Sequence, residues 1–350
     1  MNKLLLKKFR NKKVLITGHT GFKGSWLSAI FLIFGAKVYG ISKDYPTDFY
    51  KKLKLQKVKN HIFDLKNLNK TKKTIFKIKP DYIFHLAAQS IISKSYAEPV
   101  ETWNSNLNSF LNVLESLRTL KKKCNVVMIT SDKCYLNVEK KKGYKESERL
   151  GGYENYSASK ASCEILFKSY YHSFFNKSKF IQIATARAGN VIGGGDWSQN
   201  RLIPDIMKSL NKNKKLMIRN INSTRPWQHV LEPLFGYIHL ASNLGINKKL
   251  SGESFNFGPF RAKNYTVEKI LKIFKKSFHK LRWEKKNSLS FNESALLNLN
   301  CKKAYLKFKW KSKLNFYETI NDTIYWYKNY KKDGVKNITF KQIKNYLHKI

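Results

Sequence analysis

The stretch VLITGHTGFKG, residues 14–24, decides the fold of this chain. Its first four residues form an apolar, β-prone run, and a helical pattern follows the glycines over residues 25–34. Gly35 ends that pattern, and residues 37–42 are typical of a second strand. Glycines between a strand and a helix let the backbone approach a pyrophosphate at the positive end of the helix. The stretch therefore predicts a βαβ unit that binds a dinucleotide, here with the spacing GxxGxxG.

The pattern of alternating strands and helices continues beyond this unit. Apolar strands are expected at residues 61–65, 81–86, 124–130 and 180–186, and a long helix at residues 98–121. Such alternation predicts a parallel, doubly wound sheet, whose ligands collect beyond the carboxyl ends of its strands. The glycine-dense run 187–197 is expected to leave the sheet as a loop, because no helix starts in it.

Acidic and small residues follow three of the predicted strands. Asp44 lies about 20 residues past the glycine loop, where an acid often binds a ribose hydroxyl, but Lys43 precedes it. This position leaves NAD and NADP both open. Asp64 either contacts an adenine or caps a helix beginning near Lys66. The small pair Ala87 and Ala88 allows a dinucleotide to lie against a strand end.

A tyrosine and a lysine four residues apart, Tyr156 and Lys160, share one face of a predicted helix. A lysine ammonium one turn away favours the phenolate and is expected to lower the pKa of the tyrosine. Such a pair can take a proton from a sugar hydroxyl or another alcohol. The chain contains 19 tyrosines, so chance spacing on an amphipathic helix explains the pair equally well when it is considered alone.

A second polar cluster, Ser131-Asp132-Lys133, comes directly after the predicted strand 124–130. Serine and aspartate at this place are also common turn residues. The functional interpretation is a hydroxyl, an acid and an amine that point into the crevice at the strand ends.

The composition indicates a folded protein with an unusual charge. The chain has 350 residues, 42% of them hydrophobic, and a formal net charge of +45. A charge of this size suits a nucleic acid or an anionic membrane, but the lysines are scattered, and we favour a solvated basic surface without either partner. The four cysteines show no metal-binding spacing. A basic N-terminus without an apolar core predicts a cytoplasmic protein, and we expect no bound metal.

The C-terminal half predicts a second, smaller α/β domain. Its expected elements are helices at residues 202–210, near Glu232 and at residues 316–330, and a strand at residues 215–219. We predict a dinucleotide-binding domain over residues 1–190, with a returning segment near 227–245. Residues 191–226 and 246–350 are expected to form mainly the substrate domain.

These motifs together resemble the extended short-chain dehydrogenase/reductase family. More narrowly, residues 17–26 (TGHTGFKGSW), 130–135 (TSDKCY) and 187–197 (RAGNVIGGGDW) are similar to the sugar-nucleotide dehydratases that act on CDP-glucose. Residues 201–205 (RLIPD) and 225–230 (RPWQHV) fit the same group. The resemblance spans roughly residues 10–330. It implies a Rossmann-type domain that binds NAD, a small C-terminal domain for a nucleotide sugar, and a homodimer, with a homotetramer as the alternative.

The resemblance also implies the reaction and the residues that carry it out. Glucose linked to CDP would be oxidised at C4, lose water across C5 and C6, and regain the hydride at C6. Tyr156 with Lys160 would act as base, Ser131 would bind the C4 oxygen, and Asp132 would protonate the departing hydroxyl. Lys133 stands where related dehydratases carry a glutamate, so a base at C5 is expected there. The expected binding residues are Gly18, Gly21, Phe22, Lys23 and Gly24 at the cofactor pyrophosphate, Asp64 and Leu65 at the adenine, Ala87 and Ala88 along the cofactor, and Asn190, Arg201 and Arg225 at the substrate.

Three alternatives remain at this stage. A sugar-nucleotide epimerase shares the fold and the tyrosine but has no need of the acid Asp132. A dehydratase for dTDP- or GDP-linked sugars shares the chemistry. A redox-sensing regulator would bind NAD(P) with the same fold and nucleic acid with its basic charge, and would not need Tyr156 and Lys160.

Overall fold

The large sheet of the protein has seven parallel strands. The structure is a computed structural model, and it describes residues 3–43, 46–140, 142–260, 263–285 and 296–350. The strands run in the order β11-β6-β5-β4-β1-β2-β3. Their bounds are β1 Lys13–Thr17, β2 Lys37–Ser42, β3 Lys59–Ile62, β4 Tyr82–His85, β5 Cys124–Ile129, β6 Ile181–Ala188 and β11 Ser254–Phe257. The strand order reverses direction between β1 and β4, and ligands bind at such a switch point in open α/β sheets.

Helices cover both faces of this sheet, which explains why its strands are apolar on both sides. Val14 and Ile16 of β1 face one core, and Leu15 between them faces the other. The first core holds α1 (Lys3–Phe9), α2 (Phe22–Ile33), α10 (Leu231–Leu244) and α14 (Val335–Lys349). The second holds α4 (Leu68–Ile78), α7 (Ser109–Arg118) and α8 (Asn155–Tyr170). This arrangement confirms the predicted α/β class with a doubly wound, Rossmann-type parallel sheet.

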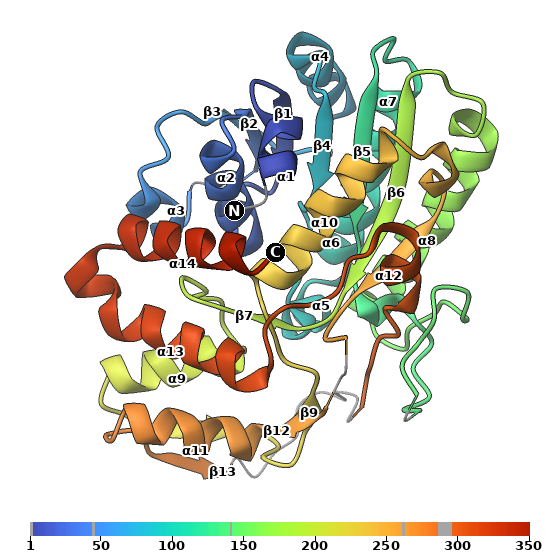
Figure 1. The fold of residues 1–350 in the computed structure, drawn as a ribbon. Coiled ribbons are helices and arrows are strands. Elements are labelled where there is room, and N and C mark those ends of the chain that lie inside the picture. Colours follow the sequence, from blue (N-terminus) through green and yellow to red (C-terminus); the bar gives the residue numbers. More distant parts are fainter. Residues whose placement is uncertain (1–2, 44–45, 141, 261–262, 286–295) are drawn as a thin grey trace.

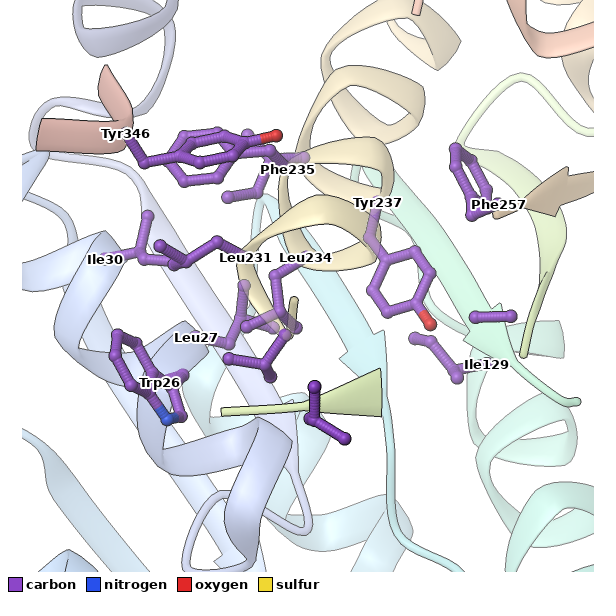
Figure 2. Close-up of a cluster of buried hydrophobic side chains, with 14 of the residues drawn as sticks. Trp26, Leu27, Ile30, Ile129, Leu231, Leu234, Phe235, Tyr237, Phe257 and Tyr346 are labelled. Carbon is purple, nitrogen blue, oxygen red and sulfur yellow. The ribbon is translucent and has the colours of Figure 1, made fainter. Parts of the chain in front are cut away.

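The first core is built mainly where α2 meets α10. Figure 2 shows Trp26 and Leu27 of α2 beside Leu231 and Leu234 of α10. Trp26 is fully buried, and its indole nitrogen donates to the carbonyl of Gly194 at 2.9 Å. This packing fixes the helix that follows the glycine loop against the segment that leaves β6.

A second group of short elements gathers beyond the large sheet, in the lower part of Figure 1. It contains α9 (Leu202–Asn211), α11 (Val267–Ser277) and α13 (Phe316–Asp333), with the strand pairs β8 (Leu216–Ile218) with β13 (Trp283–Lys285) and β9 (Thr224–Arg225) with β12 (Tyr265–Thr266). A third pair joins β7 (Val191–Ile192) to β10 (Gln228–His229). The remaining helices are α3 (Asp48–Leu53), α5 (Ile92–Ala97), α6 (Pro99–Trp103) and α12 (Lys302–Phe308).

Several predicted boundaries were wrong, each for a physical reason. Helix α2 begins at Phe22, three residues earlier than expected, because Gly24 packs against the loop within the first turn. Strand β6 continues to Ala188, so Arg187 lies inside the sheet, where a buried glutamate neutralises it. The expected helix 98–121 consists of α6 and α7 joined by a π-helical turn, Asn104–Asn108. The third strand ends at Ile62, before Asp64.

Two segments assigned to the substrate domain lie against the large sheet and its helices instead. Strand β11 pairs in parallel with β6 and extends the sheet to seven strands. Helix α14 contacts α2 and α3, and the ring of Tyr346 stacks on Phe235 of α10 at 4.8 Å between centroids. Short apolar runs can pair with any available sheet edge, so the sequence pattern alone does not indicate which sheet they join.

Candidate active site

A cavity of about 1210 Å³ opens at the carboxyl ends of the strands. Every site residue expected from the sequence lines it: Gly18, Gly21, Phe22, Lys23, Gly24, Asp64, Leu65, Ala87, Ala88, Ser131, Asp132, Lys133, Tyr156, Lys160, Asn190, Arg201 and Arg225. These residues come from segments up to 207 positions apart in the chain (18 to 225). The fold therefore brings together all the groups that the motifs singled out separately.

The glycine loop follows β1 and forms one wall of this cavity. Gly18 has a φ of +70°, and a Cβ there would lie 2.9 Å from the backbone nitrogen of Ala87. A Cβ on Gly24 would lie 2.1 Å from the carbonyl oxygen of Gly18, so these two glycines are required by the protein itself. A Cβ on Gly21 would meet only Gly18 O at 3.4 Å and would otherwise project into the cavity. Gly21 thus leaves space for a ligand rather than for the protein.

Positive charge is concentrated beside that loop. Gly21 is the N-cap of α2 and gives the first-turn N–H groups no side-chain acceptor. Burial, with smaller effects of the charges of Arg201 and Lys160, lowers the pKa of Lys23 to about 8. Arg201 is paired with the buried carboxylate of Asp196 at 3.2 Å. Cations gathered at a helix N-terminus suit a ligand with a phosphate or diphosphate group.

The turn after β5 presents the acid of the site. Ser131 caps a short 3₁₀ turn, Asp132–Cys134, by accepting a hydrogen bond from the backbone N–H of Lys133 at 3.2 Å. The Ser131 hydroxyl donates to Oδ1 of Asp132 at 3.0 Å. Asp132 is 5% exposed, and burial raises its pKa above the usual aspartate range despite Lys133, Ser131, Lys23 and Arg225 nearby. Asp132 is therefore a carboxyl that holds its proton unusually strongly.

Tyr156 and Lys160 occupy the first two turns of α8, and both are buried. Burial raises the pKa of Tyr156 to about 12, which outweighs a hydrogen bond with Ser131 and the charge of Arg201. Burial also lowers the pKa of Lys160. The expected depression of the Tyr156 pKa was wrong, because burial of the phenol outweighs the interactions that favour the phenolate.

The far end of the cavity is formed by the loops after β2 and β3. Oδ1 of Asp64 accepts the backbone N–H of Lys66 at 2.9 Å. The N-cap of α4 is Asn67, so the alternative role of Asp64 as a helix cap was wrong. Lys43 lines the cavity and is paired with Glu101 at 2.8 Å. Asp44, the other acid considered for ribose binding, lies outside the described residues.

Two residues that position the site were missed in the sequence. Glu154 is the N-cap of α8, and its Oε2 accepts the backbone N–H of Tyr156 at 2.7 Å. An acid just before a helix was the available signal, although serine, threonine, asparagine or aspartate is more usual at this position. Asn106 donates to the hydroxyl of Ser159 at 2.9 Å from the π-helical turn, a feature that is frequent at functional sites but has no local sequence pattern.

The four cysteines are buried with free thiols: Cys124, Cys134, Cys163 and Cys301. Among the described residues, no cluster of three or more histidine, cysteine or acidic side chains could hold a metal ion. Within the same part of the chain, no helix combines the length and apolar character needed to cross a membrane.

The strand order, the glycine loop and the serine, tyrosine and lysine around one cavity define an enzyme fold of the extended short-chain dehydrogenase/reductase class. Comparison with known proteins narrows this class. Residues 15–323 match the family described as GDP-mannose 4,6 dehydratase. The chain belongs to this family of NAD-dependent sugar dehydratases and epimerases.

Individual relatives agree with this placement. The chain is 40% identical over 328 residues to CDP-glucose 4,6-dehydratase of Salmonella typhimurium, covering 91% of each protein. It is 24% identical to UDP-glucose 4-epimerase of Mycoplasma genitalium, covering 92% of this chain and 98% of that one. Among solved structures, dTDP-glucose 4,6-dehydratase of Bacillus anthracis in complex with NAD has a TM-score of 0.74 at 19% identity, covering 91% of this chain and 97% of that one. An epimerase from Methanothermobacter thermautotrophicus has a TM-score of 0.82 at 20% identity and 98% coverage of both chains.

Proposed function

We propose that this chain is an NAD-dependent hydro-lyase that converts CDP-glucose to CDP-4-dehydro-6-deoxyglucose. The observation that carries the proposal is the buried Asp132, whose pKa is raised by burial, beside Tyr156 in one cavity. Elimination of water needs an acid for the departing hydroxyl, whereas epimerisation does not. The similarity to the Salmonella CDP-glucose enzyme, 40% over 91% of both chains, supports CDP as the nucleotide.

The residues around the glycine loop fit NAD. Gly18, Gly21 and Gly24 with Phe22 and Lys23 would hold the pyrophosphate, because Gly21 leaves room and Lys23 supplies charge. Asp64 and Leu65 would meet the adenine, and Ala87 and Ala88 would lie along the cofactor. A nicotinamide held by these residues would supply the hydride acceptor for C4 and the hydride donor for C6 of the glucose.

Tyr156 is the residue that takes the proton from the 4-hydroxyl. Its phenol is hydrogen-bonded to Ser131, so Tyr156 and Ser131 together can hold the C4 oxygen while the proton moves. The charge of Arg201 favours the phenolate, and Lys160 on the next turn adds a buried cation. The positive lining of the cavity thus offsets part of the burial that raises the pKa of Tyr156 to about 12.

Asp132 and Lys133 act at the other end of the sugar. Asp132 gives its proton to the hydroxyl leaving C6, which departs as water. Lys133, on the same turn, takes the proton from C5, which the neighbouring ketone makes acidic.

Three residues from the segments after β6 are proposed to bind the nucleotide diphosphate and ribose. Arg201 is the N-cap residue of α9, Arg225 lies in β9, and Asn190 follows β6. A guanidinium can bind two phosphate oxygens through parallel hydrogen bonds. We propose the division into a cofactor domain and a substrate domain on this basis, with β11 and α14 added to the first.

A homodimer in the cytoplasm is the proposed state of the enzyme. Four large apolar side chains are exposed on α5, α6, α8 and the turn after α8: Tyr96, Val100, Ile165 and Phe174. Apolar groups of this size on neighbouring helices suit an interface between two copies of the chain. Light scattering coupled to gel filtration measures the mass directly, and a mass of about 41 kDa would contradict the dimer.

The test of the function is direct. The protein and NAD are incubated with CDP-, UDP-, dTDP- and GDP-glucose, and formation of the 4-keto product is followed. We expect CDP-glucose to give the highest kcat/KM. A preference for dTDP-glucose would leave the dehydratase chemistry intact and overturn the nucleotide.

Deuterium separates a dehydratase from an epimerase. CDP-glucose deuterated at C4 should give a product with deuterium at C6, and solvent deuterium should enter only at C5. Return of the label to C4 would show an epimerase instead. The variant Tyr156→Phe tests the base itself. It lacks one hydroxyl and should keep the fold, and its turnover should fall by about 10²–10⁴-fold.

A further inference from the structure

Lys43 stands where a dinucleotide-binding fold distinguishes between its two cofactors. It is the first residue after β2, and it lines the cavity together with the glycine loop that follows β1. At this end of the second strand, an acid binds the ribose 2′-hydroxyl of NAD, whereas a basic residue accommodates the 2′-phosphate of NADP. Lys43 considered alone would therefore favour NADP over the NAD assigned above.

An acid from another part of the chain binds the charge of this lysine. Glu101 of α6 lies 58 positions further along the sequence, and its Oε1 accepts a hydrogen bond from Nζ of Lys43 at 2.8 Å. Its other oxygen, Oε2, accepts one from Nζ of Lys66, in the loop after β3, at 2.9 Å. Both ammonium groups therefore converge on one carboxylate.

A hydroxyl is the third donor to this carboxylate. Ser105 lies one turn after Glu101, donates to its Oε1 at 2.6 Å and lines the cavity beside Lys43. Hydrogen bonds from Lys43, Ser105 and Lys66 lower the pKa of Glu101 to about 2. Glu101 is therefore an anion throughout the neutral pH range.

The charges of this cluster balance without a ligand. Lys66 is also paired with Asp64, at 3.4 Å, so two lysines face two carboxylates. A 2′-phosphate would bring about two further negative charges to cations that already have partners, and Glu101 would repel it. A ribose 2′-hydroxyl carries no charge and meets no such repulsion.

The ion pairs of Glu101 are too exposed to matter much for the stability of the fold. The side chains of Lys43, Lys66 and Glu101 are 38%, 33% and 29% exposed. Ion pairs this open to water contribute little to folding. Loss of the Glu101 charge should consequently leave the fold intact and change what binds beside it.

We propose that Glu101 makes the protein select NAD over NADP, because its carboxylate occupies the two lysines that a 2′-phosphate would need. This selection rests on the NAD site proposed at the glycine loop, and it is independent of which nucleotide sugar is the substrate. Glu101 is a specificity-determining residue that acts through Lys43 and Lys66 and takes no part in the reaction.

The test is the binding of NAD and NADP to Glu101→Gln, measured by titration calorimetry without a sugar. This substitution keeps the size of the side chain and removes its charge. The matched control is Glu115→Gln, which removes the same charge from a pair with Arg118 at 2.6 Å on α7. Adenosine 2′,5′-bisphosphate and 5′-AMP serve as shorter probes that lack the nicotinamide. Asp44 is unchanged in every variant, so its own effect on phosphate binding is common to all of them.

The parent protein and Glu115→Gln should both bind NAD more tightly than NADP. In Glu101→Gln the affinity for NADP should rise by about tenfold, since the repelling charge is gone and the lysines are released. The affinity for NAD should change by less than about twofold, because its 2′-hydroxyl is neutral. The gain for NADP should shrink as the salt concentration rises, since exposed charges are screened. Adding Lys43→Met to Glu101→Gln should abolish it.

An unchanged preference in Glu101→Gln would overturn the proposal, as would a parent protein that binds NADP as tightly as NAD or binds neither. An equal gain in Glu115→Gln would reduce the effect to net charge, and a gain that survives Lys43→Met would exclude the lysine. Thermal unfolding checks that each variant keeps the fold. Failure to form a 4-keto product from any nucleotide sugar would remove the proposed reaction instead, and the calorimetry, which needs no turnover, would still decide how the cofactor is selected.

Discussion

Two buried carboxylates lie near the ends of neighbouring strands, and their surroundings differ sharply. Glu164 of α8 is 0% exposed and Asp132 is 5% exposed, so burial penalises the charge of both. Glu164 accepts hydrogen bonds from Thr130 at 2.5 Å, Arg187 at 2.7 Å, Thr185 at 2.9 Å and Ser254 at 3.0 Å. Its pKa is lowered, because the charge and hydrogen bond of Arg187 outweigh burial. Asp132 accepts one hydroxyl, and its pKa is raised.

The number of hydrogen-bond donors around each buried acid therefore decides whether the acid stabilises the fold or can give up a proton. With four donors and a paired cation, Glu164 is a permanent anion that ties α8 to β5, β6 and β11. With one donor, Asp132 has a raised pKa, which favours its protonated form. Glu164, which has four donors, holds the helix that carries Tyr156, and Asp132, which has one, faces the cavity.

The largest effect is expected on product formation, when Asp132 is replaced. Asp132→Asn removes the acid, so product formation should fall by about 10²–10⁴-fold. Oxidation at C4 does not use Asp132, so the absorbance of reduced nicotinamide should build up during a single turnover. The free energy of unfolding should not fall, because an amide carries no buried charge. Elimination at the parent rate would remove Asp132 from the mechanism.

Breaking the Arg187–Glu164 pair should instead lower the stability of the protein. Arg187→Met leaves the charge of Glu164 without its cation, and breaking a buried pair of this kind lowers the free energy of unfolding by about 3–5 kcal/mol. Urea denaturation measures this change. The control is Arg118→Met, which breaks an exposed pair with Glu115 at 2.6 Å and should have a much smaller effect. Equal effects of the two variants would show that burial does not strengthen the Arg187 pair.

The pH dependence of stability should separate the two acids. The folded-state pKa of Glu164 is lowered, so its contribution is present above the unfolded pKa and is lost as pH falls through the folded value. The folded-state pKa of Asp132 is raised, so its contribution is present below the unfolded pKa and is lost as pH rises through the folded value. In denaturation series across pH, Glu164→Gln should reduce the loss of stability as pH falls below the unfolded pKa of a glutamate, and Asp132→Asn the loss as pH rises above the unfolded pKa of an aspartate. The same change in both variants would contradict the assignment.

The smallest effect is expected for a cation. Arg187 and Lys23 differ as the two acids do, because their pKa values shift in opposite directions. Arg187 is paired and its pKa is raised by Glu164, whereas the pKa of Lys23 is lowered to about 8. NAD affinity should therefore weaken as pH rises through 8 and Lys23 loses its charge. The change should be about two- to fivefold, as for other charges near a helix N-terminus. Titration calorimetry measures it, and Lys23→Met should bind NAD more weakly with no such pH dependence.

Much of the site could be predicted because its motifs are local. The glycine loop, the Ser131–Lys133 turn and the Tyr156–Lys160 spacing each follow from residues close in the chain, and parallel strands end at one edge of the sheet. Their convergence on one cavity was therefore expected. The sign of the Tyr156 pKa shift was not, because it depends on burial by segments that no local pattern identifies.

By itself, the sequence determined the parallel α/β fold, the strands from β1 to β6, the helix that carries Tyr156 and part of the cavity lining. These features follow from apolar periodicity and from glycine and turn chemistry, which act over a few residues. Only the tertiary structure decided that β11 completes the sheet, that Arg187 is buried beside Glu164, and that Asp132 keeps one donor while Glu164 has four. Desolvation and hydrogen-bond satisfaction depend on which distant segments meet, so they are settled only when the chain has folded.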